Sequence, residues 1–180
     1  MAILSQTRPE PEFSRPFAVD RLGSTSVTET LQAGPAERAA LALRFGIVDL
    51  EQLSATLNLE RILGGLIRVV GRLEADVVQN CVITLIDFPT HIEDSFTVDF
   101  AGTEMPIGPG AEITVDVDYD PPEPVEGGVI DMGELVAQYL SLALDPYPRS
   151  PGAAIDPVWA DSDAAERSPF AILKNLKTPN

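Results

Sequence analysis

The chain contains one histidine and one cysteine, two residue types that often carry chemistry near neutral pH. A histidine that activates a nucleophile must be held beside it and oriented by a third group. His91 is predicted to lie in a hairpin connection, and no G-x-S-x-G segment offers it a serine. We therefore expect a surface histidine, and we predict that the protein is not an enzyme and has no catalytic residue.

Cys81 falls on the apolar side of a predicted strand. A thiol in such surroundings packs as a small hydrophobe, and burial raises its pKa. A single cysteine also excludes an intramolecular disulfide and a metal site built from several cysteines. No glycine-rich segment has the spacing of a phosphate-binding loop. We assign Cys81 a structural role and predict that the protein holds no metal and no cofactor.

Three aspartates at alternate positions, Asp116, Asp118 and Asp120, resemble the start of a calcium-binding loop. Such a loop needs glycine at its sixth position and glutamate at its twelfth, which here are Pro121 and Gly127. We expect these aspartates instead to form a negative stripe on the exposed face of a strand. Together with the nearby Glu123 and Glu126, they are the predicted acidic part of a partner-binding surface.

The charge of the chain supports that prediction. There are 28 acidic residues against 12 Lys and Arg, which gives a formal net charge of -16, and no Lys or Arg stands between Arg72 and Arg149. A surface of one sign attracts a cationic partner and repels a phosphate backbone. Direct RNA binding is therefore disfavoured. The residues that could support it are a modest cationic cluster of Arg61, Arg68 and Arg72. The alternative is that the acidity only keeps the protein in solution.

Hydrophobic periodicity predicts two helices and several strands. Pro35 and Gly46 mark the start and the stop of the first helix. The longest strand should bend near Gly71 or at a bulge near Gln79. The predicted strands cover residues 13–20, 26–31, 51–60, 67–85, 95–100 and 113–119, and the predicted helices cover residues 35–45 and 131–144.

The second helix has signals at both ends. Asp131 can cap its free N–H groups, and Glu134 three residues later completes a capping-box pattern. Pro146, which follows Asp145, ends it. Most of its circumference is apolar, so we expect it to be largely buried. We assign structural roles to Asp131, Glu134, Pro146 and Pro148.

Residues 149–180 are predicted to be a linker rich in proline and alanine followed by a short helix. Phe170, Leu173 and either Leu176 or Lys177 fall on one face of that helix, with Lys174 beside them. This pattern is typical of a short docking helix on a tether. Two destinations remain open, the surface of a partner and the protein's own domain. For a partner, the contact residues would be Phe170, Leu173 and Lys174.

These elements predict an α+β fold in which a curved, mainly antiparallel sheet of five to seven strands is covered by two helices. A partly closed barrel is the alternative. We place a flexible leader at residues 1–12 and a single domain at residues 13–148. The N-terminus has no signal-peptide pattern and no apolar run is long enough for a membrane span, so we expect a cytoplasmic protein that does not bind membranes.

Several segments in the same order resemble the YceD family, the large ribosomal RNA subunit accumulation proteins. Together these segments span nearly the whole chain, and their order and spacing make the resemblance specific. The segments that carry the resemblance are Glu12–Pro16, Val77–Leu85, Asp120–Gly128, Ile130–Val136, Leu142–Pro148 and Ser168–Lys174.

The resemblance implies a role in accumulation of the large-subunit ribosomal RNA, in a family to which no enzymatic activity is attributed. Combined with the acidic surface, this role leads to our first hypothesis, in which the partner is a basic ribosomal protein or an assembly intermediate of the large subunit. Many relatives carry a C-x-x-C pair and further cysteines after the second helix, which suggests a metal site. Here Thr84 occupies the partner position of Cys81, so a zinc role does not carry over. The other hypotheses are an acidic binding module or chaperone unrelated to ribosomes, an unrecognised enzyme, and a direct RNA binder.

Overall fold

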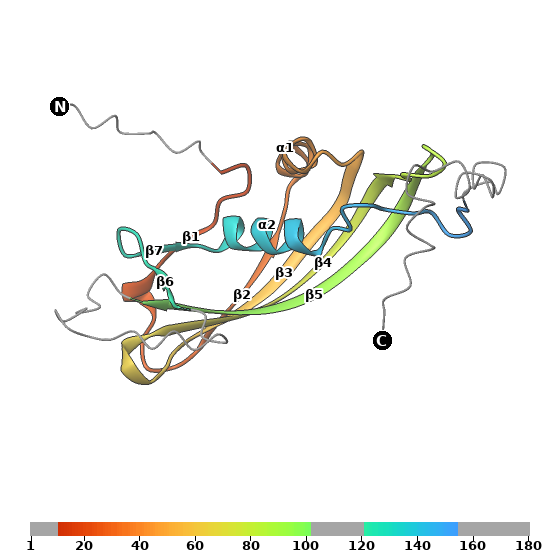
Figure 1. The fold of residues 1–180 in the computed structure, drawn as a ribbon. Helices are drawn as coiled ribbons and strands as arrows, with labels where there is room; N and C mark the ends of the chain where they lie inside the picture. The colour runs from red at the N-terminus through yellow and green to blue at the C-terminus, as the bar shows by residue number, and fades with distance from the viewer. Residues whose placement is uncertain (1–10, 102–120, 155–180) are drawn as a thin grey trace, which may run out of the picture.

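The computed structural model describes residues 11–101 and 121–154. Its larger sheet has five strands in the order β2–β3–β4–β5–β6, and a separate two-stranded sheet pairs β1 with β7 (Figure 1). All pairings are antiparallel except the short parallel pairing of β5 with β6. The elements are β1 (Pro16–Ala18), η1 (Val19–Arg21), β2 (Val27–Gln32), α1 (Pro35–Phe45), β3 (Asp49–Arg61), η2 (Leu63–Gly65), β4 (Ile67–Asn80), β5 (Asp87–Ala101), β6 (Glu123–Pro124), β7 (Val129–Asp131) and α2 (Met132–Ala143).

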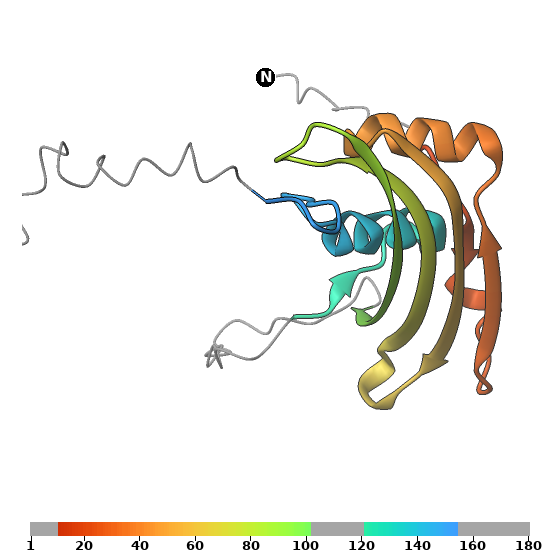
Figure 2. The same cartoon turned by 90° about the vertical axis from the view of Figure 1, so that its right-hand side faces the viewer.

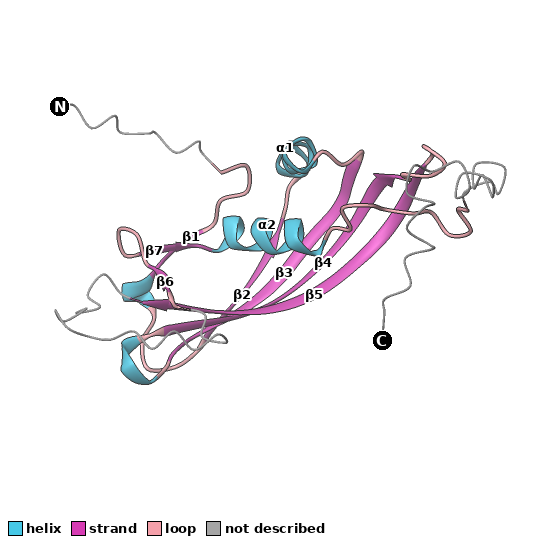
Figure 3. Cartoon of the chain, viewed as in Figure 1, coloured by secondary structure: helices cyan, strands magenta, loops and turns pink. Residues whose placement is uncertain are grey.

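The predicted α+β class, with two helices and mainly antiparallel sheets, is confirmed. Both helices lie on the same side of the large sheet, and its strands sweep around α2 (Figures 1 and 2). Figure 3 colours the same view by secondary structure and shows the helices in cyan and the strands in magenta. The described strands do not close into a barrel, because β2 and β6 remain the two edges of the sheet. No helix of the described residues is long and apolar enough to cross a membrane.

The long predicted strand is shorter than expected. β4 ends at Asn80, and residues 82–84 form a turn that leads into β5. The Cys81 carbonyl accepts a hydrogen bond from Leu85, and the Cys81 N–H donates to Ile86, so the backbone closes on itself there. The apolar alternation continued past Asn80, but the turn interrupts the strand that this alternation predicted.

β5 is longer than expected, because it begins at Asp87 instead of residue 95. His91 therefore lies within a strand, and its predicted place in a hairpin connection is wrong. The predicted bulge near Gln79 is also wrong: β4 and β5 pair without a shift, and the irregularity of the sheet falls between Leu50 and Gln52 of β3. Similarly, the predicted strand 13–20 shortens to β1, because β7 offers it only three partner residues.

Gly71 of β4 makes room for an aromatic ring. It pairs with Phe96 of β5, and a Cβ atom built on Gly71 would lie 2.2 Å from that ring. The Phe96 ring stacks on Tyr139 of α2, with 3.9 Å between centroids and 5° between planes. Aromatic pairs of this kind add to the energy of burial. The glycine thus lets α2 pack closely against the centre of the sheet.

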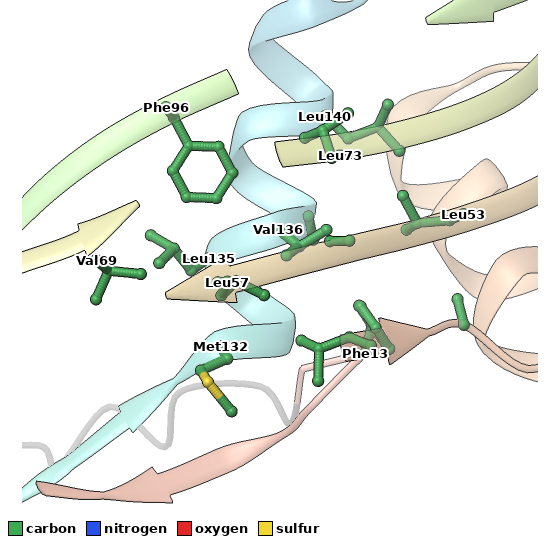
Figure 4. Close-up of a cluster of buried hydrophobic side chains, with 14 of the residues drawn as sticks. Phe13, Leu53, Leu57, Val69, Leu73, Phe96, Met132, Leu135, Val136 and Leu140 are labelled. Atoms are coloured by element: carbon green, nitrogen blue, oxygen red, sulfur yellow. The ribbon is translucent and has the colours of Figure 1, made fainter. Parts of the chain in front are cut away.

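The core lies between the inner face of the sheet and α2 (Figure 4). Leu57, Val69 and Leu73 on the strands face Val136 and Leu140 on the helix, and all five are fully buried. Alternation along each strand places these side chains on one face, as the sequence predicts. The helix is less buried than we expected, because Leu142 is 77% exposed on its outer face.

Candidate partner-binding surface

The start of α2 is held by the N-terminal segment. Asp131 caps the helix by accepting hydrogen bonds from the N–H groups of Gly133 and Glu134, at 3.0 and 3.2 Å. The same carboxylate accepts the Arg15 N–H at 2.8 Å and the Ser14 hydroxyl at 2.6 Å. Such capping bonds satisfy N–H groups that have no partner within the helix. One side chain thus joins two segments that lie more than 110 residues apart in the sequence.

The backbones of these segments touch at Gly133. A Cβ atom there would lie 2.4 Å from the Phe13 carbonyl oxygen and 3.0 Å from the Arg15 nitrogen. Because both atoms belong to the backbone, they cannot move aside as the end of a side chain can. Glycine is therefore the residue that fits at the first turn of α2.

Two arginines form ion pairs near the contact between the N-terminal segment and α2. Arg15 forms an ion pair with Glu37 of α1, and this partner lowers the pKa of the Glu37 carboxyl group. Arg44 donates to Glu12 at 2.9 Å and to Glu134 at 2.7 Å. We call this group the clasp; it consists of Glu12, Ser14, Arg15, Glu37, Arg44, Asp131 and Glu134.

The clasp corrects one prediction. The Glu134 carboxylate pairs with Arg44, and it does not complete a capping box on α2. A box-like contact is instead found at the start of α1, where Glu37 accepts the Gly34 N–H at 2.7 Å. The sequence pattern alone could not exclude an arginine 90 residues away as the partner of Glu134.

On the outer face of β4 and β5, two carboxylates are paired with arginines of β4. Arg68 pairs with Asp99, and Arg72 pairs with Glu93, in both cases across neighbouring strands. His91 lies 2.7 Å from Asp76, and its hydrogen bonds to Asp76 and Glu93 raise the pKa of its imidazole. Arg68 and Arg72, which come at or before the start of the span without lysine or arginine, therefore pair with two of its carboxylates, while acidic side chains still outnumber the arginines on this face.

The three arginines of the predicted cationic cluster are all engaged in contacts within the protein. Arg68 and Arg72 are paired with carboxylates, and Arg61 donates to the backbone carbonyls of Val19 and Leu22. Phosphate binding by these arginines would have to displace those partners. The structure therefore brings no open cationic patch together from these three residues.

Acidic side chains gather in a second place, beside β6 and the start of α2. A concavity of about 440 Å³ has Glu123, Glu126, Asp131 and Glu134 among its lining residues, and no lysine or arginine of the described residues lines it. We call it the acidic concavity. Its remaining walls are mostly apolar: they are formed by Pro16, Phe100, Pro124, Val129, Ile130 and Leu135, with Gln138 beside them.

An apolar floor with a carboxylate rim can accept a lysine or arginine, because both carry a hydrocarbon stem and a charged end. Asp131 and Glu134 are already engaged in the clasp. Glu123 and Glu126 also line the concavity, and both residues are exposed. The structure thus brings the two predicted partner-binding glutamates together with apolar residues, such as Phe100 and Leu135, that no sequence pattern marked as contact residues.

The other predicted contact residues cannot be placed. Residues Asp116, Asp118 and Asp120, the strand predicted at 113–119, and the tail residues Phe170, Leu173 and Lys174 all lie outside the described residues. Asp120 directly precedes the described segment that leads to Glu123.

Cys81 is fully buried in the turn after β4. Burial acts to raise the pKa of its thiol, but the N–H groups of Ser150 and Thr84 donate to the sulfur, at 3.3 and 3.5 Å, and together bring the pKa to about 6. The predicted raised pKa is therefore wrong. The sequence could not show that two backbone N–H groups would meet the sulfur.

These contacts do not make a metal site. Structural zinc is held by four Cys or His ligands, whereas Thr84 and Ser150 meet Cys81 through their backbone. No group of three or more His, Cys, Asp or Glu within residues 11–101 and 121–154 could hold a metal ion. Pro146 and Pro148 lie in the same region, where the Pro148 carbonyl accepts the Val82 N–H at 2.9 Å.

A family model described as "Large ribosomal RNA subunit accumulation protein YceD" matches residues 69–177, which is 109 of the 180 residues. The chain belongs to the YceD family. The YceD match begins in β4 and includes the acidic concavity apart from Pro16. It also includes α2 and the Cys81 turn, whereas the N-terminal residues of the clasp precede it. No curated protein and no solved structure matches the chain.

Proposed function

We propose that this YceD-family protein is a cytoplasmic, non-enzymatic factor that supports large-subunit assembly and ribosomal RNA accumulation by binding a basic protein of the large subunit. The family's description supports the link to large-subunit RNA. The observation that carries the binding mode is the acidic concavity, which has the exposed residues Glu123 and Glu126 in its lining. A lysine or arginine of the partner enters it, with its stem on Phe100 and Leu135.

The negative stripe predicted at Asp116, Asp118 and Asp120 would extend this surface along the chain toward Glu123. A partner held by opposite charge is released when a denser polyanion competes for it. Ribosomal RNA is such a polyanion, so the partner would pass from the protein to the RNA. The strength of binding should fall as salt rises, because exposed charges are screened over about 10 Å at 0.1 M ionic strength.

The test is affinity capture from lysate with the full chain, carried out with and without nuclease. Glu123→Lys combined with Glu126→Lys is compared with a control, Asp20→Lys combined with Glu51→Lys. Each double variant changes the net charge from -16 to -12 (four units, two per substitution), and all four residues are exposed.

We expect the wild type and the control to recover one basic large-subunit protein in the presence of nuclease, and the variant at the concavity to lose it. Equal loss in both variants would show that only total charge matters. Recovery that depends on RNA would favour direct RNA binding, and many partners of mixed function would favour a generic binding module or chaperone.

A further inference from the structure

A second surface lies at the other end of α2 from the clasp. A cavity of about 380 Å³ opens between the end of α1, the end of β4 and the segment that follows α2, with Leu144, Pro146 and Pro148 among its lining residues. Exposed large apolar side chains lie in the same segments as these lining residues. Val82 lines the cavity, Val48 and Tyr147 are next to lining residues in the sequence, and Leu85 and Ile86 are hydrogen-bonded to Cys81 beside Val82. We call this surface the end patch and its five exposed side chains the rim: Val48, Val82, Leu85, Ile86 and Tyr147.

The rim is unusually exposed for residues of this kind. Leu85, Ile86 and Tyr147 are 73%, 66% and 70% exposed. Single exposed apolar side chains are common, but a group of them around a cavity marks an interaction site. Leu85 also has a φ of 58°, a left-handed conformation that is rare for leucine. The turn therefore keeps an apolar residue at its tip where glycine or asparagine would fit more easily.

The parts of the end patch are fixed to each other. The Val82 N–H donates to the Pro148 carbonyl at 2.9 Å, and the Ser150 N–H donates to the Cys81 sulfur at 3.3 Å. These bonds attach the segment after α2 to the turn after β4. The two segments also lie at the same end of the molecule in Figure 1. The surface is thus preformed.

We propose that residues 168–177 of the same chain dock on the end patch. In a helix, Phe170, Leu173 and Leu176 share one face, since residues three apart are neighbours. That face offers the apolar side chains that a preformed apolar surface takes up. Of the two destinations that the sequence left open, the protein's own domain is therefore the one that the structure favours.

The place where the described chain ends supports an intramolecular contact. The chain passes through Pro148, which lines the cavity, and is described to Ala154. Only thirteen residues, 155–167, separate that point from Ser168, and they can span up to about 45 Å when extended. Tethering raises the local concentration of the segment to about the millimolar range. This favours the chain's own segment over that of a second copy.

Charge favours the same contact. Residues 166–177 carry Arg167, Lys174 and Lys177 against Glu166, a net charge of +2, so the rest of the chain carries -18 (-16 minus +2). Asp145 lines the cavity of the end patch. The family match includes both the end patch at the turn after β4 and the segment as far as Lys177.

Photo-crosslinking of the full chain tests the proposal. Benzoylphenylalanine replaces Phe170, and the crosslinked peptides are identified by mass spectrometry in an equal mixture of light and heavy isotope-labelled chains. In the control, the same probe replaces Trp159, which lies within the thirteen-residue connection. We expect the probe at position 170 to crosslink within one chain to residues 79–86 or 144–148, and the probe at position 159 to give no such preference.

Variants of the end patch complete the test. Leu85→Asp with Ile86→Asp should lower the crosslinking yield at least about tenfold, as a loss of ~1.4 kcal/mol in docking would. Leu63→Asp, at an equally apolar and 97% exposed site on η2, should leave the yield unchanged. Crosslinks between light and heavy chains would show a second copy as the occupant. That result, crosslinks to other parts of the domain, or no crosslinks would each overturn the proposal.

Discussion

The clasp and the end patch lie at opposite ends of α2. They differ in whether their side chains have partners within the described structure. In the clasp, one carboxylate accepts four hydrogen bonds, and two arginines pair with three glutamates. In the end patch, apolar side chains stand in solvent and Leu85 holds a rare backbone conformation. The contacts of the clasp therefore stabilise the domain, whereas the end patch exposes apolar side chains on which the segment proposed above can dock. Substitutions at the two ends should change stability in opposite directions.

The largest effect is expected at the backbone contact of the clasp. Gly133→Ala places a Cβ atom against the Phe13 carbonyl, and overpacking of this kind costs about 2–3 kcal/mol in the free energy of unfolding. Chemical denaturation followed by circular dichroism measures it. Gly23→Ala is the control: a Cβ atom there meets nothing within 4 Å, so the change should be within about 0.5 kcal/mol. Equal effects would show that the close contact is not formed in solution.

The next effect is expected at the cap of α2. Asp131→Ala removes an N-cap that is worth about 1–2 kcal/mol by itself, and it also leaves the Ser14 hydroxyl and the Arg15 N–H without their acceptor. We expect a loss of about 2 kcal/mol by the same denaturation measurement. Ser14→Ala should cost less, because it leaves the cap intact. If the two variants lost the same amount, the cap would contribute nothing beyond the Ser14 contact.

At the end patch the sign should reverse. Leu85→Asn relieves a left-handed conformation that costs a leucine about 1 kcal/mol more than an asparagine. In chains that also carry Phe170→Asp, which removes the docking proposed above, we expect Leu85→Asn to raise the free energy of unfolding by up to about 1 kcal/mol. Leu63→Asn is the control, since Leu63 is also exposed and has no such conformation. A loss of stability at position 85 would show that the apolar tip stabilises the domain and would remove the contrast between the two ends.

The smallest effect is expected on the outer face of the sheet, which belongs to neither end. The folded protein raises the pKa of His91, so its contribution to stability is present below the unfolded value of about 6.5 and is lost as pH rises through the folded pKa. The stability difference between the wild type and His91→Gln should therefore shrink between pH 5.5 and pH 8.5. Denaturation midpoints at both pH values measure this difference. A difference that grows with pH would contradict the pairing of His91 with Asp76.

The sequence predicted what depends on local pattern. The alternation of Leu53, Leu57 and Leu59 places β3 correctly on the inner face, and the signals at Pro35 and Gly46 give the bounds of α1. These predictions hold because side-chain period and backbone conformation are set by near neighbours.

The sequence could not predict what depends on distant residues. Arg44 and Glu134 meet across 90 positions, and Arg68 meets Asp99 only because β4 and β5 pair in one particular register. For this reason the sequence did not show that Asp99 and Glu93 on the outer face are paired with arginines. The candidate site was predicted only in part: Glu123 and Glu126 were included, but their apolar floor depends on how α2 crosses β5.

The pairing of β1 with β7 joins a strand that is synthesised early to one that is synthesised late. Pro16–Ala18 leaves the ribosome early, but its partner Val129–Asp131 is made more than 110 residues later. At about 5–20 residues per second, the N-terminal strand waits roughly 6–22 seconds for that partner. Throughout that interval Phe13 and Phe17, both buried in the finished fold, have no α2 to cover them. The pairing of β1 with β7 therefore cannot form until Asp131 has been made, and a nascent chain cut short before Asp131 cannot complete it.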